Sequence, residues 1–202
     1  MITIVDYGRG NLRSVEKAFE YLGHQVKVSS DPGAVAEADA LVLPGVGAFD
    51  DAIISLKEKG LDEAIRDFIR QDRPYLGICL GYQLLFESSE EGKERGLDIL
   101  PGRVRRLPGK GLKVPHMGWN SIEIAAESPL LQGIRNGSYC YFVHSYFVEP
   151  EDDSLVLTWT EYGVRFASGV HRGKLAAFQF HPEKSSRTGL AILANFATMV
   201  GG

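Results

Sequence analysis

The chain has 202 residues, a usual size for one compact α/β domain, and 44% of them are hydrophobic. Its 23 Gly and 9 Pro form no repeat or biased tract, which excludes collagen-like, coiled-coil and disordered classes. With 22 Lys and Arg against 26 Asp and Glu, the formal charge of −4 disfavours binding to nucleic acid. The basic cluster in the sequence is short and is interpreted as a solvated surface: Arg103, Arg105, Arg106, Lys110 and Lys113.

Neither export nor membrane insertion is expected. Residues 1–6 contain no basic leader, and their apolar run ends too early for a signal peptide. No segment approaches the roughly 18 consecutive apolar residues of a membrane-spanning helix. Two cysteines, Cys79 and Cys140, are too few to indicate a disulfide framework in a chain of this length. We therefore expect a single domain over residues 1–202 that works in the cytoplasm.

The first half of the chain alternates short apolar strands with helices. Strands are predicted over residues 2–5, 25–28, 40–43 and 74–78. Helical spacing of apolar residues predicts helices over residues 12–22, over 50–70 with an interruption at Gly60, and over 82–86. This alternation is typical of an open, mostly parallel sheet covered by helices on both faces.

The second half of the chain carries a different pattern. Runs of β-branched and aromatic residues are separated by Gly, Pro and Asp, at residues 99–107, 113–117, 139–148, 155–160 and 175–180. Such runs indicate hairpins and thus an antiparallel β region. An amphipathic helix over residues 188–199 is expected to close the chain.

The segment Gly77-Ile78-Cys79-Leu80-Gly81 carries the strongest chemical signal. It joins the strand at 74–78 to a helix through Gly-x-Cys-x-Gly, the cysteine form of a nucleophile elbow. Glycines two residues to either side allow a tight turn that presents the central side chain, and a helix N-terminus stabilises a thiolate. Without other evidence Cys79 could also be a small buried core residue.

A thiolate nucleophile requires a base, and His181 is the histidine best placed to serve. It follows the strand predicted at 175–180, at the edge where active sites of parallel sheets gather. Glu183 stands two residues later on a turn stiffened by Pro182, where it can fix the tautomer of His181. Cys79, His181 and Glu183 therefore form a candidate triad. A zinc site is disfavoured because no second cluster supplies the remaining ligands.

Pro44-Gly45-Val46-Gly47 follows the strand at 40–43 and is expected at the same sheet edge as the elbow. Its backbone N–H groups, with that of Leu80, form a candidate oxyanion hole. The stretch from Asp6 to Asn11 has two glycines but lacks the third of Gly-x-Gly-x-x-Gly, so a dinucleotide cofactor is not expected.

Taken in this order, the motifs resemble the class I, triad-type glutamine amidotransferases, and the resemblance spans nearly the whole chain. Six segments carry it: residues 4–12, 44–49, 77–81, 115–120, 141–146 and 181–185. Pro-Gly-Val-Gly and Pro-His-Met-Gly-Trp-Asn (115–120) resemble the histidine-biosynthesis branch of that family. The resemblance implies a flavodoxin-like sheet and glutamine hydrolysis to glutamate and ammonia without a cofactor or metal.

The resemblance also implies residue roles. Cys79 attacks the side-chain amide of glutamine to form a thioester, His181 transfers the proton, and Glu183 orients His181. The oxyanion would be held by Val46, Gly47 and Leu80. Glutamine would be bound by Gly47, Gln83, Glu91, Ser145 and Tyr146. For Glu91 a second interpretation stays open, because residues 87–94 form an acidic run typical of a solvated surface.

Free ammonia would be largely protonated in water, so the chemistry implies a partner that receives it directly. By the resemblance, this is a (β/α)₈ cyclase subunit that makes imidazole glycerol phosphate and aminoimidazole carboxamide ribotide in a heterodimer. Trp119, Asn120 and Lys184 are the interface candidates. Two alternatives stay open: the glutaminase component of another synthase (anthranilate or pyridoxal phosphate), against which Pro-Gly-Val-Gly argues, and a non-catalytic flavodoxin-like cysteine sensor or binding module.

Overall fold

The computed structural model describes residues 1–109 and 111–200, so Lys110 of the basic cluster lies outside the described residues. The helices are α1 (Leu12–Tyr21), α2 (Pro32–Ala36), α3 (Phe49–Glu58), α4 (Leu61–Arg70), α5 (Leu80–Gln83) and α6 (Ser186–Thr198). The strands of the first half are β1 (Ile2–Val5), β2 (Val26–Ser29), β3 (Ala40–Gly45), β4 (Tyr75–Cys79) and β5 (Ser88–Ser89). Those of the second half are β6 (Gly102–Arg106), β7 (His116–Ser121), β8 (Glu123–Ile124), β9 (Tyr139–His144), β10 (Tyr146–Pro150), β11 (Val156–Glu161), β12 (Arg165–Arg172) and β13 (Leu175–Phe178).

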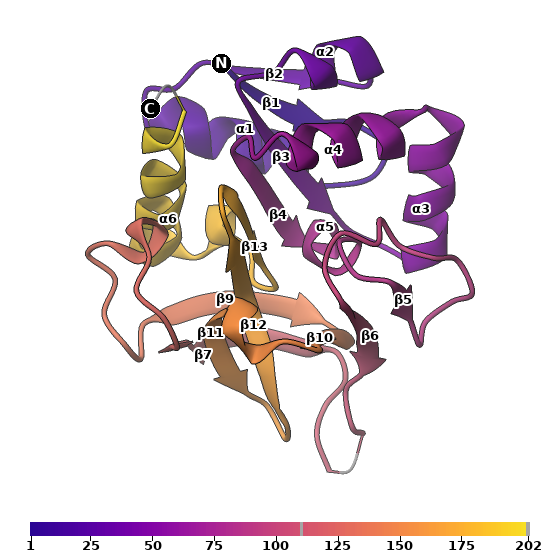
Figure 1. The fold of residues 1–202 in the computed structure, drawn as a ribbon. Helices are drawn as coiled ribbons and strands as arrows, with labels where there is room; N and C mark the ends of the chain where they lie inside the picture. The colour runs from indigo at the N-terminus through magenta and orange to yellow at the C-terminus, as the bar shows by residue number, and fades with distance from the viewer. Residues whose placement is uncertain (110, 201–202) are drawn as a thin grey trace.

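One large sheet runs through the molecule in the order β2-β1-β3-β4-β13-β12-β10-β6-β5 (Figure 1). Neighbours from β2 to β13 pair in parallel, whereas β13, β12, β10 and β6 pair antiparallel. β7 and β9 form a separate antiparallel pair. The predicted α/β class, with a parallel sheet and an antiparallel region in the second half, is confirmed.

Helices bury both faces of the parallel part of the sheet. α1 and α6 pack side by side on one face, and α2, α3 and α4 cover the other (Figure 1). Within β3, Ala40 and Val42 point towards the face covered by α1 and α6, and Leu41 and Leu43 point towards the face covered by α2, α3 and α4. Burial on both faces explains why these strands consist of continuous apolar runs. It also holds the ends of β3 and β4, from which the site is built, in a fixed position.

The helix after the elbow differs from the prediction of 82–86. It begins directly after the strand, as α5, and ends after a single turn. The carbonyl groups of Leu84 and Leu85 then accept hydrogen bonds from a returning loop, from the N–H groups of Leu97, Ile99 and Leu100. These tertiary bonds replace the bonds that a longer helix would have needed.

Other elements also depart from the predicted boundaries. The run at 139–148 divides at Ser145 into β9 and β10, which belong to different sheets. The strand expected at 113–117 begins later, as β7. Helix α2 was not predicted, although Asp31 caps it and Pro32 occupies its first turn. Strand β12 was also not predicted, yet it joins the parallel and antiparallel parts of the sheet.

The described basic residues agree with a solvated surface. Arg103 and Arg105 each form an ion pair with Glu149, and Arg105 also pairs with Glu90. Because these pairs lie at the surface, each contributes little to stability. None of the described helices is long and apolar enough to cross a membrane.

Candidate active site

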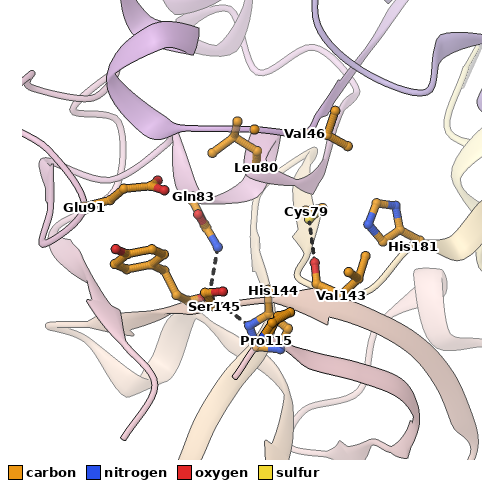
Figure 2. Close-up of a pocket in the computed structure, with 12 residues that line it drawn as sticks. Val46, Cys79, Leu80, Gln83, Glu91, Pro115, Val143, His144, Ser145 and His181 are labelled. Carbon is orange, nitrogen blue, oxygen red and sulfur yellow. Dashed lines mark hydrogen bonds between the residues drawn. The ribbon is translucent and has the colours of Figure 1, made fainter. Parts of the chain in front are cut away.

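Cys79 lies at the junction of β4 and α5, in a tight turn where the backbone of α5 packs closely against the end of β3. Its φ of 55° and ψ of −108° are unusual for a residue with a side chain, so the elbow stores backbone strain. The thiol is 7% exposed, at the base of a pocket rather than on an open surface. Figure 2 shows Cys79 between Leu80 and Val143, with the imidazole of His181 beside it.

Glycine is required at the two flanking positions because neighbouring atoms leave no room for a Cβ, and not because of unusual dihedral angles. A Cβ on Gly81 would overlap the carbonyl oxygen of Leu43 in β3. A Cβ on Gly77 would lie 2.9 Å from the carbonyl oxygen of Gly81. The turn therefore presses α5 against the end of β3, and this contact fixes where the Cys79 side chain points.

His181 and Glu183 form a buried pair just beyond β13. Nδ1 of His181 lies 2.9 Å from Oε1 of Glu183, and the two side chains are 3% and 1% exposed. Nε2 of His181 has no hydrogen-bond partner among the described residues, so it is the nitrogen available to the thiol. Burial alone would lower the pKa of His181, but Cys79 and Glu183 outweigh it and raise that pKa to about 10. Both neighbours therefore favour the protonated form of the ring.

Strand β9 fixes the backbone around the nucleophile and the histidine. The Cys79 thiol lies 3.8 Å from the carbonyl oxygen of Val143. The N–H of His181 donates to the carbonyl of Tyr141 at 2.9 Å. The Ser185 hydroxyl accepts from the N–H of Tyr141 and donates to the carbonyl of His181. Movement of β9 would therefore displace both reacting side chains.

A cavity of about 330 Å³ opens above the thiol. Nine of the residues predicted for catalysis, oxyanion binding or glutamine binding line it: Val46, Gly47, Cys79, Leu80, Gln83, Glu91, Ser145, Tyr146 and His181. Glu183 lies behind His181 and outside the lining. These residues come from five separate stretches of the chain, which the strand order brings to one edge of the sheet (Figure 2).

The predicted oxyanion residues lie on two neighbouring strand ends. Gly45 is paired with Cys79 in the register of β3 and β4, so Val46 and Gly47 project beyond the nucleophile. Gly47 has a φ of 97°, which favours glycine. Leu80 begins α5, where the first backbone N–H groups have no partner within the helix.

Gln83 and Glu91 occupy the end of the cavity opposite His181 (Figure 2). The Gln83 amide donates to the carbonyl of Tyr146 and to Oε1 of Gln179, both at 2.9 Å. Oε2 of Glu91 accepts the N–H of Phe49, at the start of α3. Glu91 is therefore held at the cavity by its own contact and is not simply a member of a solvated acidic run.

Sequence reasoning missed several residues around the cavity. Pro115 and Val143 line it, and the amide of the fully buried Gln179 donates to the Cys79 sulfur across 3.8 Å. Gln179 directly precedes Phe180 and His181, so its closeness to the histidine was visible in the sequence. The role of its amide depends on the pairing of β13 with β4, which local patterns do not reveal.

The three interface candidates differ in where their side chains lie. Trp119 is 52% exposed, packs edge-on against Tyr141, and shares one face of β7–β9 with the exposed Met117 and Tyr139. Lys184 is exposed and directly precedes Ser185, which bonds Tyr141. Asn120 instead points inward, and its amide contacts Nε2 of His116 and the carbonyl of Glu161.

Within residues 1–109 and 111–200, no group of three or more His, Cys, Asp or Glu side chains could hold a metal ion. Both cysteines belong to this described part, and both are buried free thiols.

Comparison with known proteins relates this geometry to a family. The sequence matches the family Glutamine amidotransferase class-I over residues 3–200. Imidazole glycerol phosphate synthase subunit HisH of Moorella thermoacetica is 53% identical over 200 residues, covering 98% of this chain and 95% of that protein. The subunit of the same name from Aquifex aeolicus is 54% identical over 195 residues, covering 96% and 94%.

Solved structures share the fold at lower sequence identity. A crystal structure of a glutamine amidotransferase covers 100% of both chains, with 20% identity and a TM-score of 0.78. PurLQS from Thermotoga maritima is 17% identical, covers 98% of this chain and 97% of that chain, and has a TM-score of 0.78.

Proposed function

The chain belongs to the class-I glutamine amidotransferase family, and from this premise we propose that it is the glutaminase subunit of imidazole glycerol phosphate synthase in histidine biosynthesis. The observation that carries the proposal is the meeting of Cys79 with the buried His181–Glu183 pair in one cavity. The identity to HisH proteins over nearly the whole chain supports this synthase over the anthranilate and pyridoxal phosphate alternatives.

The residues can carry out the hydrolysis in two steps. The Cys79 thiol passes its proton to Nε2 of His181 as its sulfur attacks the side-chain carbonyl carbon of glutamine. The oxygen that gains charge is held by the N–H groups of Val46, Gly47 or Leu80. The imidazolium of His181 gives its proton to the departing amine, which leaves as ammonia. Water then attacks the thioester while His181 takes up its proton, and glutamate and the thiol are released. Glu183 keeps Nδ1 of His181 occupied so that Nε2 faces the sulfur.

The positions of the lining residues favour one orientation of glutamine in the cavity. Its amide lies at Cys79, and its charged end lies towards Gln83, Glu91 and Tyr146. The Glu91 carboxylate suits the α-ammonium group of the substrate. The backbone around Ser145 and Tyr146 forms the opposite wall.

The ammonia passes to a (β/α)₈ cyclase subunit in a heterodimer in the cytoplasm. We place the contact on the outer face of β7–β9, defined by Met117, Trp119, Tyr139, Tyr141 and Val143, with Lys184 beside it. Three of these side chains are more than half exposed, which is typical of a surface that a partner covers. Asn120 lies behind this face and supports it without touching the partner.

Glutamate release by the purified chain, alone and with the cyclase subunit carrying its ribotide ligand, tests the proposal. We expect strong activation by the liganded cyclase and a loss of about 10³-fold or more in Cys79→Ala. Cys140→Ala is the matched control and is expected to keep its activity, because that thiol is a buried core residue outside the cavity. Equal rates for the wild type and Cys79→Ala would overturn the proposal.

A further inference from the structure

Two buried histidines connect the paired strands β7 and β9 to the substrate cavity. His116 and His144 are register partners on the inner face of this pair, opposite the outer face, and are 3% and 6% exposed. Nδ1 of His144 lies 2.8 Å from the Tyr146 carbonyl oxygen, and Nε2 of His144 lies 2.9 Å from Nδ1 of His116. Nε2 of His116 lies 3.3 Å from the Asn120 amide nitrogen.

These contacts allow one arrangement of protons when both rings are neutral. A carbonyl only accepts, so Nδ1 of His144 carries the hydrogen and its Nε2 must accept. His116 then donates from Nδ1, and its Nε2 accepts from Asn120. The second amide hydrogen of Asn120 goes to the carbonyl of Glu161, and Oδ1 of Asn120 accepts the N–H of Ser121. Each donor and acceptor of the two imidazole rings and of the Asn120 amide therefore has a partner.

The surroundings keep both rings neutral. His116 is stacked between Tyr162 and Phe142, and His144 packs against Phe166. Burial lowers the pKa of His116 to about 4. Burial, with smaller effects of His116 and His181 and against the hydrogen bond to the Tyr146 carbonyl, lowers the pKa of His144 to about 3.

The Tyr146 carbonyl links these hydrogen bonds to the residues around the nucleophile. It accepts from His144 and also from Gln83, whose second hydrogen goes to Oε1 of Gln179. The Gln179 amide in turn donates to the Cys79 sulfur. The Tyr146 carbonyl in the cavity wall thus accepts two hydrogen bonds. One comes from His144, which is held by His116 of β7, and the other comes from Gln83, which is linked through Gln179 to the nucleophile.

We propose that His116 and Asn120 are positioning residues for glutamine binding: through His144 they hold the Tyr146 carbonyl, and with it Gln83, in place behind the outer face of β7–β9. The inference rests on the proposed function. Without the donor at position 116, the His144 ring is free to turn or change tautomer, and the cavity wall loses a fixed partner. The binding of glutamine is then affected more than the chemical step.

A matched pair of variants separates hydrogen bonding from packing. His116→Phe keeps an aromatic ring between Tyr162 and Phe142 but removes the donor, whereas His116→Asn keeps an amide donor near the place of Nδ1 and removes the ring. In the complex with the cyclase, we expect His116→Phe to raise the KM for glutamine about tenfold, with a smaller change in kcat. His116→Asn is expected to recover most of that loss. A higher KM for glutamine in His116→Asn than in His116→Phe would overturn the inference and show that His116 acts through packing alone.

Nitrogen NMR of the histidine-labelled wild type supplies a readout that does not depend on activity. We expect both rings to be neutral with the hydrogen on Nδ1, and an Nε2–H form of either ring would overturn the inference. A wild type that fails to hydrolyse glutamine would refute the proposed function while leaving the NMR result intact. Normal hydrolysis with a wild-type KM in His116→Phe would refute only the positioning role.

Discussion

At the scale of single residues, different neighbours shift the pKa values of three buried histidines in opposite directions. Cys79 and Glu183 raise the pKa of His181, whereas burial among neutral groups and aromatic rings lowers the pKa values of His116 and His144. One histidine is thereby ready for proton transfer, and the other two serve as fixed donors and acceptors. The same side-chain chemistry acts in catalysis and in positioning because the neighbours differ.

These charge states predict how stability depends on pH. In the unfolded chain a histidine titrates near 6.5, but folding lowers the pKa of His116 to about 4 and that of His144 to about 3. Below about pH 6.5 the unfolded state binds protons that the folded state does not. The free energy of unfolding therefore falls with acidification, by up to about 1.4 kcal/mol per pH unit for each ring, until the folded-state pKa is reached.

Urea denaturation between pH 7 and 5 measures this slope. We expect His116→Phe and His116→Asn to reduce it equally, because both remove the same titrating group whatever they do to packing. Their free energies of unfolding at pH 7 can differ without affecting this test. Slopes equal to that of the wild type in both variants would contradict the account.

At the scale of elements, the elbow depends on contact between β3, β4 and α5. We expect Gly81→Ala to destabilise the fold by about 3 kcal/mol, because the new methyl group meets the Leu43 carbonyl and pushes α5 away from β3. In a chain of this length that corresponds to a fall in Tm of roughly 6 to 12 °C. Glutamine hydrolysis is expected to fall as well, since Cys79 and Leu80 move with the turn.

Thermal unfolding of Gly81→Ala and Gly109→Ala measures this effect. A Cβ at Gly109 meets nothing within 4 Å, so its variant is expected to keep a Tm close to the wild type. Equal Tm values for the two variants would show that the contact with β3 is not what requires glycine at position 81.

The elements that the sequence predicts well are those with a local cause. The apolar run of β4, the glycines around Cys79 and the His-Pro-Glu turn each lie within a few residues, so their pattern locates the nucleophile and the base. Gln179 was not predicted as a contributor to the site, because its contacts depend on which strands pair and in what register. The end of α5 was misplaced for the same reason, since a distant loop takes the carbonyl groups of Leu84 and Leu85.

At the scale of the whole molecule, the outer face of β7–β9 and the cavity are adjacent, and Val143 belongs to both. The β9 backbone contacts the Cys79 thiol and the N–H of His181, while the exposed side chains of the same pair of strands face away from the sheet. A partner that covers this face would therefore lie close to the site where the proposed function forms ammonia. In the proposed complex, this closeness would let ammonia reach the partner before it is protonated in water.

The transfer of nitrogen from glutamine is the measurement that tests this account most directly. The chain and a cyclase subunit with its ribotide substrate are supplied with glutamine labelled with ¹⁵N in the side-chain amide, in a buffer containing unlabelled ammonium. The account predicts that imidazole glycerol phosphate carries the ¹⁵N label, and that Cys79→Ala yields only product with unlabelled nitrogen from the buffer. A wild-type product with the isotope ratio of the buffer would contradict it.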